Sequence, residues 1–279
     1  MKIIKRKTKK HLWRIWRDGL VWTWLMKKIL HALRISRFFI VKRQFYRAYV
    51  QHDPFSLWMW MYPRITRPDE LFVHRFLQAG DVVLDVGANI GIITLTAASA
   101  VGPSGKVISY EPHPHTFSFL KRNISLNLYQ NIVPHNMALG NSVGTSQILN
   151  HYVKDINHIV ETGGVEIEMT TLDVHCTEPH INFLKIDAEG YELFILRGAS
   201  QTLSRTDVVF VEFSPKTYTR FEYTFTDVWN ELVCAGFSVY EIQKDYSLVK
   251  IDGTYITHQK YKNVIALRNM DEYYRRMST

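Results

Sequence analysis

The sequence predicts an α/β protein with a mostly parallel sheet that is covered by helices on both faces, preceded by a basic N-terminal helical arm. Three observations lead to this prediction. From residue 80 onward, short apolar β-branched runs alternate with helical segments. A glycine-containing loop, Asp85-Val-Gly-Ala-Asn-Ile-Gly91, joins the first of these runs to a helix. The positive charge is concentrated in residues 1–50.

Length and composition fit one α/β domain with an appendage. The chain has 279 residues, of which 46% are apolar, so it can bury a full core. Its two cysteines, Cys176 and Cys234, form no CxxC pair and suggest neither a disulfide framework nor a zinc site. We therefore predict an arm and connector over residues 1–60 and a main α/β domain over 61–279.

The arm carries charge of the opposite sign to the rest of the chain. Residues 1–50 contain 15 Lys/Arg and one acid, Asp18, for a net charge of +14, whereas the remaining 19 Lys/Arg and 25 acids give −6. This asymmetry indicates an anionic partner for the arm, either membrane lipid or nucleic acid.

An amphipathic helix accounts for most of the arm. At 100° per residue one broad face is apolar, the other carries Arg14, Arg17, Asp18 and Lys28, and Lys27 and Arg34 intrude on the apolar edge. The longest uncharged stretch, Gly19 to Met26, is too short to span a bilayer, which needs about 20 residues, and no signal-peptide cleavage site follows. A basic amphipathic helix suits an anionic membrane surface; packing on its own domain or on a second subunit is the alternative. The apolar face comprises Leu12, Ile15, Trp16, Trp22, Met26, Ile29, Leu30 and Leu33.

The elements after the arm follow from periodicity and punctuation. Residues 51–67, with prolines among aromatics, read as a connector, and Pro68-Asp-Glu70 opens a helix that ends near Gly80. The predicted strands are 81–86, 106–110, 132–139, 181–186, 208–213, 237–242 and 264–268. The predicted helices are 90–101, 114–128, 191–205 and 226–235.

Two regions depart from strict alternation. No helix separates the last two strands, so we expect them to pair as an antiparallel edge. Residues 140–180 contain glycines and short alternating runs, which predict a β-rich insertion between the third and fourth strands. This insertion is either a wall of an acceptor pocket or a solvated hairpin.

The loop at 85–91 has the position of a nucleotide-binding loop. Gly87 permits a sharp turn, and Gly91 leaves room for a ligand at the helix start. The dinucleotide fingerprint requires glycine where this chain has Asn89 and Ile92, which argues against NAD. Glu111, at the end of the next strand, can accept hydrogen bonds from both ribose hydroxyls. Asn136 and Met137 lie near the end of the third strand, where an adenine would rest.

A second acidic cluster, Lys185-Ile-Asp-Ala-Glu-Gly-Tyr-Glu192, ends the fourth strand, and Glu212 lies near the end of the fifth. We predict that Asp187, Glu189 or Glu212 removes a proton from an acceptor hydroxyl. The alternatives are that the cluster holds Mg²⁺, for which no ligand set is indicated, or that Asp187 only positions the cofactor and Glu192 favours the helix start. His113 and His115, which flank Pro114, are either site residues or exposed; we include His113 among the catalytic candidates.

Together these segments resemble the FkbM family of methyltransferases. The likeness covers residues 70–270 and leaves the arm outside. The matching stretches are Asp85–Gly91, Tyr110-Glu-Pro-His-Pro114, Asn136-Met-Ala-Leu-Gly140, Thr170-Thr-Leu-Asp173, Leu184-Lys-Ile-Asp-Ala-Glu-Gly190 with Glu192, and Val211-Glu-Phe-Ser-Pro215.

The resemblance implies a class I, Rossmann-like methyltransferase sheet of seven strands and S-adenosylmethionine as methyl donor. It implies O-methylation of a hydroxyl, and we expect the hydroxyl to belong to a sugar of a glycan or glycolipid. By the same resemblance Asp85, Gly87, Asn89 and Gly91 hold the methionine part of the cofactor and Glu111 holds its ribose, while the division of labour between Asp187 and Glu189 stays open.

Two other functions stay open. One is a nucleic-acid methyltransferase that uses the basic arm, against which stand the acidic domain and the lack of an Asn/Asp-Pro-Pro-Tyr/Phe motif. The other is a non-catalytic, membrane-associated protein that binds the cofactor. We expect a cytoplasmic location, including peripheral attachment to the inner face of the membrane through residues 1–50.

Overall fold

A computed structural model describes residues 21–51, 54–149, 158–255 and 262–278. The chain divides into two compact units, one comprising residues 1–66 with 152–155 and the other residues 67–151 with 156–279. No helix in the described part of the chain combines the length and apolar character that crossing a bilayer requires.

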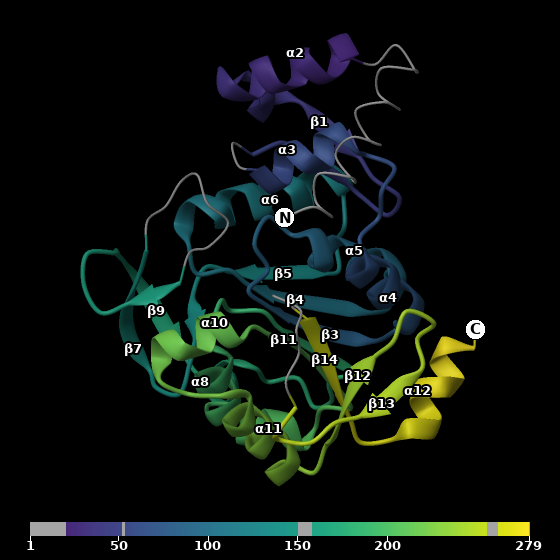
Figure 1. The fold of residues 1–279 in the computed structure, drawn as a ribbon, viewed down its shortest axis with the longest axis vertical. Coiled ribbons are helices and arrows are strands. Elements are labelled where there is room, and N and C mark those ends of the chain that lie inside the picture. The colour runs from purple at the N-terminus through teal and green to yellow at the C-terminus, as the bar shows by residue number, and fades with distance from the viewer. Residues whose placement is uncertain (1–20, 52–53, 150–157, 256–261, 279) are drawn as a thin grey trace, which may run out of the picture. The chain divides into compact units, whose positions relative to one another are not determined.

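The second unit is built on an eight-stranded sheet with the order β13-β12-β14-β11-β10-β3-β4-β5 (Figure 1). The five strands from β11 to β5 are mutually parallel. This confirms the predicted sheet, with one strand more than the expected seven because the short β13 adds to β12. The strands are β3 (Val82–Val86), β4 (Lys106–Tyr110), β5 (Ile132–His135), β10 (Phe183–Ile186), β11 (Val208–Phe213), β12 (Ser238–Ile242), β13 (Leu248–Lys250) and β14 (Lys262–Leu267).

The antiparallel part of the sheet is arranged differently from the prediction. β14 does pair antiparallel with β12, but it also pairs antiparallel with β11 and so lies between them, inside the sheet. Its residues from Val264 to Leu267 are almost completely buried, as suits an interior strand. The edge is formed by β13 instead.

The predicted third strand is two strands. β5 ends at His135, and the chain then leaves the large sheet to form β6 (Ala138–Leu139) in a second sheet. Asn136 lies at the break, where its side-chain amide donates to the backbone oxygens of Glu111 and Pro112 at 2.9 and 3.0 Å. These bonds hold the chain in a turn at the point where periodicity alone predicted continuation.

The β-rich insertion predicted at 140–180 forms most of that second sheet, which has the order β6-β9-β7-β8. Its strands are β7 (Gly144–Ile148), β8 (Ile159–Val160) and β9 (Val165–Thr170), and its small core comprises Ala138, Ile148, Ile167 and Met169. A short helix, α7 (Leu172–His175), leads back to the large sheet.

Helices cover both faces of the large sheet, with α4 and α5 on one side and α8 and α11 on the other (Figure 1). The helix predicted at 191–205 is broken at Gly198, where the chain packs so closely on Gly140 that a Cβ would lie 1.9 Å from the Gly140 backbone oxygen. Asp173 accepts hydrogen bonds from the first backbone amides of the second half. The helices are α4 (Pro68–Phe76), α5 (Ile92–Val101), α6 (Pro114–Asn127), α8 (Glu192–Arg197), α9 (Ser200–Ser204), α10 (Pro215–Tyr218), α11 (Phe225–Cys234) and α12 (Met270–Met277).

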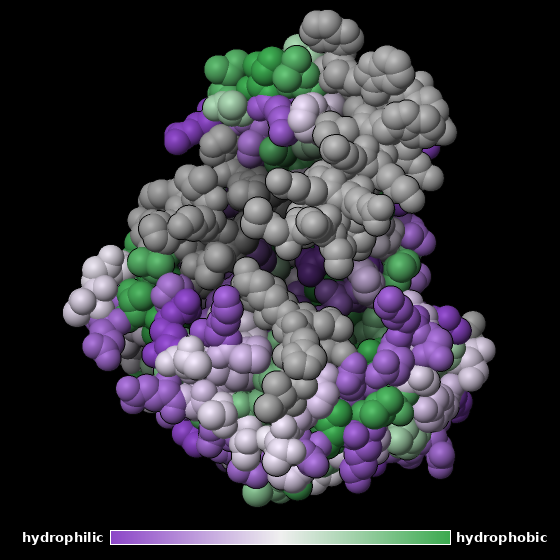
Figure 2. Space-filling model, viewed as in Figure 1, coloured by the Kyte–Doolittle hydropathy of each residue, from purple (hydrophilic) through white to green (hydrophobic). Residues whose placement is uncertain are grey.

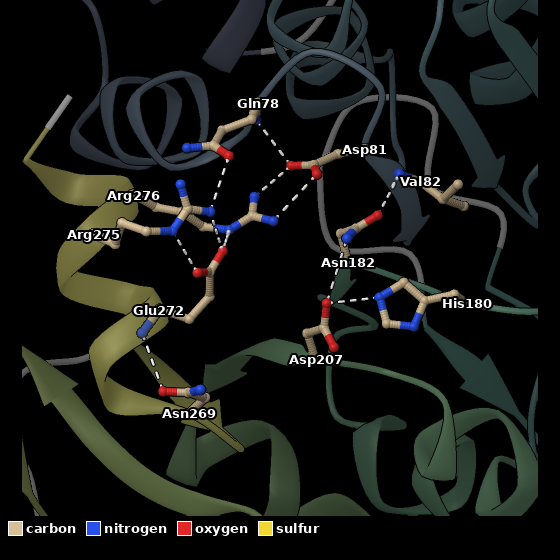
Figure 3. Close-up of polar contacts among 10 residues, drawn as sticks. All are labelled: Gln78, Asp81, Val82, His180, Asn182, Asp207, Asn269, Glu272, Arg275 and Arg276. Carbon is tan, nitrogen blue, oxygen red and sulfur yellow. Dashed lines mark hydrogen bonds and ion pairs between the residues drawn. The ribbon is translucent and has the colours of Figure 1, made fainter.

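An ion pair fastens α12 to the amino end of β3 (Figure 3). Arg276 Nη1 lies 2.6 Å from Asp81 Oδ2, and both side chains are about 8% exposed. Glu272 of the same helix holds the other side of Arg276, with Nε to Oε1 at 2.7 Å. On the neighbouring strands, Asn182 accepts from the Val82 amide and donates to Asp207 (Figure 3).

We expect Asp81→Asn to lower the free energy of unfolding by about 2–3 kcal/mol, because it leaves a buried guanidinium with one anionic partner in place of two. Urea denaturation measures this loss. Asp69→Asn is the matched control: it removes an ion pair with Arg67 at 3.1 Å that is partly exposed, and should cost about 0–1 kcal/mol. Equal losses in the two variants would contradict a special role for the buried pair.

The first unit contains more structure than the predicted arm and connector. It comprises α2 (Val21–Ala32), a 3-10 turn η1 (Ile35–Phe38), a hairpin of β1 (Ile40–Lys42) and β2 (Arg47–Tyr49), and α3 (Pro54–Met61). α3 lies within the predicted connector. The core of the first unit consists of Val41, Val50 and Trp60, with Leu30 and Leu57 packed against them. The part of the predicted amphipathic helix before residue 21 lies outside the described residues.

Candidate active site

Four neighbouring parallel strands carry an acidic residue at or near their carboxyl ends. Along the sheet these are Glu212 in β11, Asp187 after β10, Asp85 in β3 and Glu111 after β4. The carboxyl ends of parallel strands meet at one edge, which is where ligands bind in open α/β sheets. The structure thus brings Asp85 and Glu111 to the same edge as Asp187 and Glu212, although the two pairs lie far apart in the sequence.

The loop after β3 is held in a conformation that few residues adopt. Gly87, Asn89 and Gly91 have φ values of +76°, +52° and +97°. A Cβ on Gly87 would lie 1.7 Å from the backbone oxygen of Asp187, because the loops after β3 and β10 touch at this point. Gly91 begins α5, where a Cβ would meet Leu120 at 2.7 Å. The glycines therefore allow the backbone to turn closely between β3 and α5, and the space beside Gly91 is occupied by Leu120.

A buried lysine links the two loops. Lys185 Nζ lies 3.3 Å from Asp85 Oδ1 and 3.4 Å from Asp187 Oδ2. Burial alone would lower the pKa of Lys185, but the charges of Asp187 and Asp85 outweigh it and raise the pKa above its usual range. Asp85 is fully buried, and its Oδ2 also accepts from the Thr94 hydroxyl at 2.6 Å. Asp85 therefore has an internal charge partner, and its first role is to fix these strand ends.

Glu111 is buried and fixes the first loop. Its Oε2 accepts from the Asn89 amide and its Oε1 from the His113 amide, both at 2.9 Å. Burial raises the pKa of Glu111 to about 7, although the two amide hydrogen bonds favour its ionised form. A carboxylate offers about four acceptor positions, so two remain for a ligand after the two amides are satisfied.

The loop after β10 repeats this arrangement. Glu192 accepts through Oε1 from the amides of Ala188 and Gly190 at 2.9 and 3.2 Å, and Tyr223 donates to its Oε2 at 3.1 Å. Burial raises the pKa of Glu192 to about 7. Glu189 has a φ of +51°, and a Cβ on Gly190 would approach the Thr217 backbone oxygen to 2.8 Å. Glu192 therefore shapes the loop that presents Asp187 and Glu189.

Glu212 differs from the other acids of this row in its hydrogen bonding. Its Oε2 is buried and has no hydrogen-bond partner among the described residues. Burial, followed by the charges of Asp187 and Glu189, raises the pKa of Glu212 to about 10. Burial and the neighbouring charges therefore favour the neutral form of this carboxyl at neutral pH, a form that can donate a hydrogen bond to a ligand.

The remaining predicted site residues have different surroundings. His113 is buried, and its Nδ1 accepts from the Thr116 amide at 3.5 Å, so that it caps α6. Asn136 is exposed and uses its amide to hold the turn after β5. Met137 is half-buried and packs against the main core.

The acidic edge fits S-adenosylmethionine on two counts. Asp85, Asp187, Glu189 and Glu111 outnumber Lys185, the buried cation that lies among them, which suits a ligand with a sulfonium and an ammonium group. Glu111 retains acceptor positions for the ribose hydroxyls beside a glycine loop that approaches closely. No group of three or more His, Cys, Asp or Glu in the described ranges is arranged to hold a metal ion.

Lys185 lies within the second acidic motif, but the sequence alone predicted no role for it. A signal was present, since Lys185 interrupts an apolar run that reads as a fully buried strand, and a buried cation needs an acid. The acid is Asp85, which lies directly opposite Lys185 in the pairing of β10 with β3. Thr94 and Tyr223, which hold Asp85 and Glu192, carried no comparable signal.

The model of the methyltransferase FkbM domain matches residues 85–239. Methyltransferase 1 of Beauveria bassiana is 28% identical, over 42% of this chain and 57% of that protein. The hexuronic acid methyltransferase AglP of Haloferax volcanii is 31% identical, over 47% of this chain and 55% of that protein. The chain therefore spans somewhat more than half the length of these relatives. The precorrin-6y C5,15-methyltransferase of Geobacter metallireducens has a TM-score of 0.44 and 14% identity, over 73% of this chain and 90% of that one.

Proposed function

The chain belongs to the FkbM family of methyltransferases, and from this premise we propose that the whole protein methylates a hydroxyl group of a sugar in a glycan or glycolipid. Its domain is that of an S-adenosylmethionine-dependent methyltransferase of class I fold. The observation that carries the proposal is the row of carboxyl groups on four neighbouring strand ends, in which one member, Glu212, has a buried Oε2 without a hydrogen-bond partner among the described residues.

The chain's own residues bind and orient. Asp85, fixed by Lys185 and Thr94, and the loop from Gly87 to Gly91 hold the methionine part of the cofactor, while Glu111 holds its ribose. When bound, the cofactor supplies a methyl group on a sulfonium, which an acceptor oxygen can attack. Orientation of the acceptor and exclusion of water then provide most of the rate enhancement.

We assign removal of the acceptor proton to the loop after β10. Asp187 and Glu189 are partly exposed at this edge and are the carboxylates available as general base. Glu212, neutral in the free protein, is suited to donate a hydrogen bond to the acceptor. His113 remains a candidate, although its ring nitrogen caps α6.

The variant Glu212→Gln tests whether the Glu212 carboxyl is neutral, through the pH dependence of the free energy of unfolding. A raised pKa in the folded state means that the native protein binds more protons than the unfolded chain between about pH 4.5 and about pH 10, so stability falls as pH rises through this window. Glutamine resembles the neutral acid and cannot ionise. We therefore expect the variant to lose less stability than the wild type between about pH 5 and about pH 9, measured by urea denaturation.

Glu166→Gln makes the same change at an exposed position of β9 and should leave the pH dependence unaltered. An unchanged slope in Glu212→Gln would contradict the neutral carboxyl. If Glu212 is a hydrogen-bond donor, the turnover number of Glu212→Gln should stay within about tenfold of the wild type, whereas loss of a general base costs about 10²–10⁴-fold.

An aromatic group beside the acidic loop supports a sugar as acceptor. Tyr191 follows Gly190 directly, its ring stacks on Phe194 with centroids 4.5 Å apart, and Phe221 meets it edge-on at 5.4 Å. Its hydroxyl has the Met169 sulfur, at 4.0 Å, as a weak partner. Half-buried aromatic rings offer apolar faces with a polar tip, which suits a sugar ring. The name of the relative AglP, a hexuronic acid methyltransferase, agrees with this class of acceptor.

The proposal includes a membrane partner. Because residues 1–50 carry a net charge of +14, we propose peripheral attachment to an anionic membrane surface and an acceptor glycan that is linked to lipid. Incubation with labelled donor and matched lipid-linked and free oligosaccharides tests this. Preferential labelling of the lipid-linked form supports it, and equal labelling of both would remove the role of the arm.

A donor-labelling screen of glycan and lipid extracts from the source cell tests the function itself. Label in a base-stable ether on a sugar is the expected result. Label in RNA, together with a salt-sensitive RNA shift by residues 1–50, would support nucleic-acid methylation instead. Absence of any rise in melting temperature with S-adenosylmethionine would favour a non-catalytic protein.

A further inference from the structure

Helix α2 exposes apolar side chains and half-buries a lysine, which is the reverse of the usual arrangement for a helix in water. Its half-buried residues are Trp24, Lys27, Leu30 and His31, which recur on one face. The opposite face is apolar and exposed: Leu25, Met26, Ile29 and Leu33 are 40%, 50%, 43% and 62% exposed. A helix that packs only for burial in water would turn these four residues inward and Lys27 outward.

Specific contacts hold the helix in this orientation. Lys27 Nζ donates to the Trp60 backbone oxygen at 2.9 Å and lies 5.5 Å from the Trp60 ring centroid. His31 Nδ1 and Ser36 Oγ are 3.1 Å apart. Burial lowers the pKa of Lys27, as is expected of a lysine whose charge is partly removed from water. The exposed apolar face is therefore a consequence of well-made contacts on the other side of the helix.

The apolar surface continues beyond the helix. Residues 25–40 supply eight of the 17 large hydrophobic side chains that are exposed in the described part of the chain, so exposed apolar side chains are concentrated in this segment. Figure 2 shows the hydrophobic colour gathered over α2. We call these residues the 25–40 surface: Leu25, Met26, Ile29, Leu33, Ile35, Phe38, Phe39 and Ile40.

Cations accompany the apolar side chains. Between residues 21 and 51 the sequence has seven Lys/Arg and no Asp or Glu. Lys28 Nζ lies 4.0 Å from the centroid of Trp24, and the Arg37 guanidinium lies 4.9 Å from that of Phe38. Long basic side chains that lie against aromatic rings can keep their charge at a polar boundary while the apolar groups go deeper.

We propose that the 25–40 surface docks onto an anionic lipid bilayer, with its apolar side chains among the acyl chains and its basic side chains at the headgroups. A bilayer supplies both hydrocarbon and negative charge, and the surface needs both. A second copy of the chain would oppose two strongly positive surfaces, and a nucleic acid would leave the apolar face uncovered. This inference rests on the membrane partner proposed above and specifies which residues meet it.

Vesicle co-sedimentation of the full chain tests the proposal. We expect binding to phosphatidylcholine vesicles that contain phosphatidylglycerol, and binding at least about tenfold weaker to phosphatidylcholine alone or in high salt. Leu33→Glu with Phe38→Glu should weaken binding to the anionic vesicles by at least about tenfold, because two large apolar groups are lost from the bilayer and two negative charges are added. Val143→Glu with Val174→Glu, at positions 66% and 65% exposed in the second unit, is the control and should bind as the wild type does.

Two results would overturn the proposal. One is wild-type binding to anionic vesicles by the Leu33/Phe38 variant. The other is absence of vesicle binding by the wild type together with a dimer that the same variant dissociates in sedimentation, which would assign the surface to a second copy. Both variants should keep wild-type binding of S-adenosylhomocysteine, which shows that the second unit is folded. Because vesicle binding is read without any acceptor, failure of this test leaves the proposed methyl transfer standing, and failure of methyl transfer leaves this test unaffected.

Discussion

Lys185→Met should lower the free energy of unfolding by about 3–5 kcal/mol and abolish detectable binding of S-adenosylhomocysteine. The lysine is the cation that Asp85 and Asp187 share, and Asp85 is fully buried. Removal of one partner from a buried pair leaves the other charge without compensation, which costs far more than the pair contributes. Methionine has a similar length and is apolar, so it fills the space without restoring the charge.

Urea denaturation and isothermal titration calorimetry measure the two effects. Lys106→Met is the matched control, since Lys106 lies on β4 of the same sheet and pairs with Glu178 at 2.6 Å while its side chain is 44% exposed. A partly exposed pair of this kind contributes about 0–1 kcal/mol. A loss below about 1 kcal/mol in Lys185→Met, or unchanged ligand binding, would show that Asp85 does not depend on the lysine.

Much of the fold follows from local patterns in the sequence. β4 and β11 have the predicted bounds, and β3, α5 and α6 lie within about two residues of theirs, because each combines a consistent period with a clear start or stop signal. The errors lie where distant contacts override the local pattern. Gly140 packs against Gly198, where the predicted helix is interrupted, and β14 enters the sheet between β11 and β12. Neither contact can be read from periodicity.

The candidate site was predictable in its parts and not in its connections. The position of acids at strand ends follows from the alternation of strands and helices, and the structure brings these acids to one edge. Their partners depend on register, which pairs Lys185 with Asp85, and on loop geometry, which directs Glu192 to Ala188 and Gly190. Burial then raises the pKa of Glu212 above the pKa values of Glu111 and Glu192, and no pattern of residues predicts this difference.

Glu111→Gln should weaken the binding of S-adenosylhomocysteine by about 10- to 100-fold, since a hydrogen bond to a charged acceptor contributes about 1.5–3 kcal/mol. The glutamine keeps the size of the side chain and one oxygen for a backbone amide, but it cannot accept from both the Asn89 and His113 amides and also from the ribose. Calorimetry measures the affinity, and Glu178→Gln, which makes the same change at the Lys106 pair, serves as control.

The pH dependence of binding distinguishes contact with the ligand from support of the loop. Because the pKa of Glu111 is about 7, the ionised form that the ribose hydroxyls require is lost as pH falls below this value. Wild-type affinity should therefore decrease from about pH 8 to about pH 6, and Glu111→Gln should lack this part of the decrease. If the side chain only supports the loop, the variant should bind more weakly at every pH and keep the wild-type pH dependence. That result would assign the ribose to another group and leave Glu111 as the counterpart of Glu192, a buried acid that shapes the loop beside it.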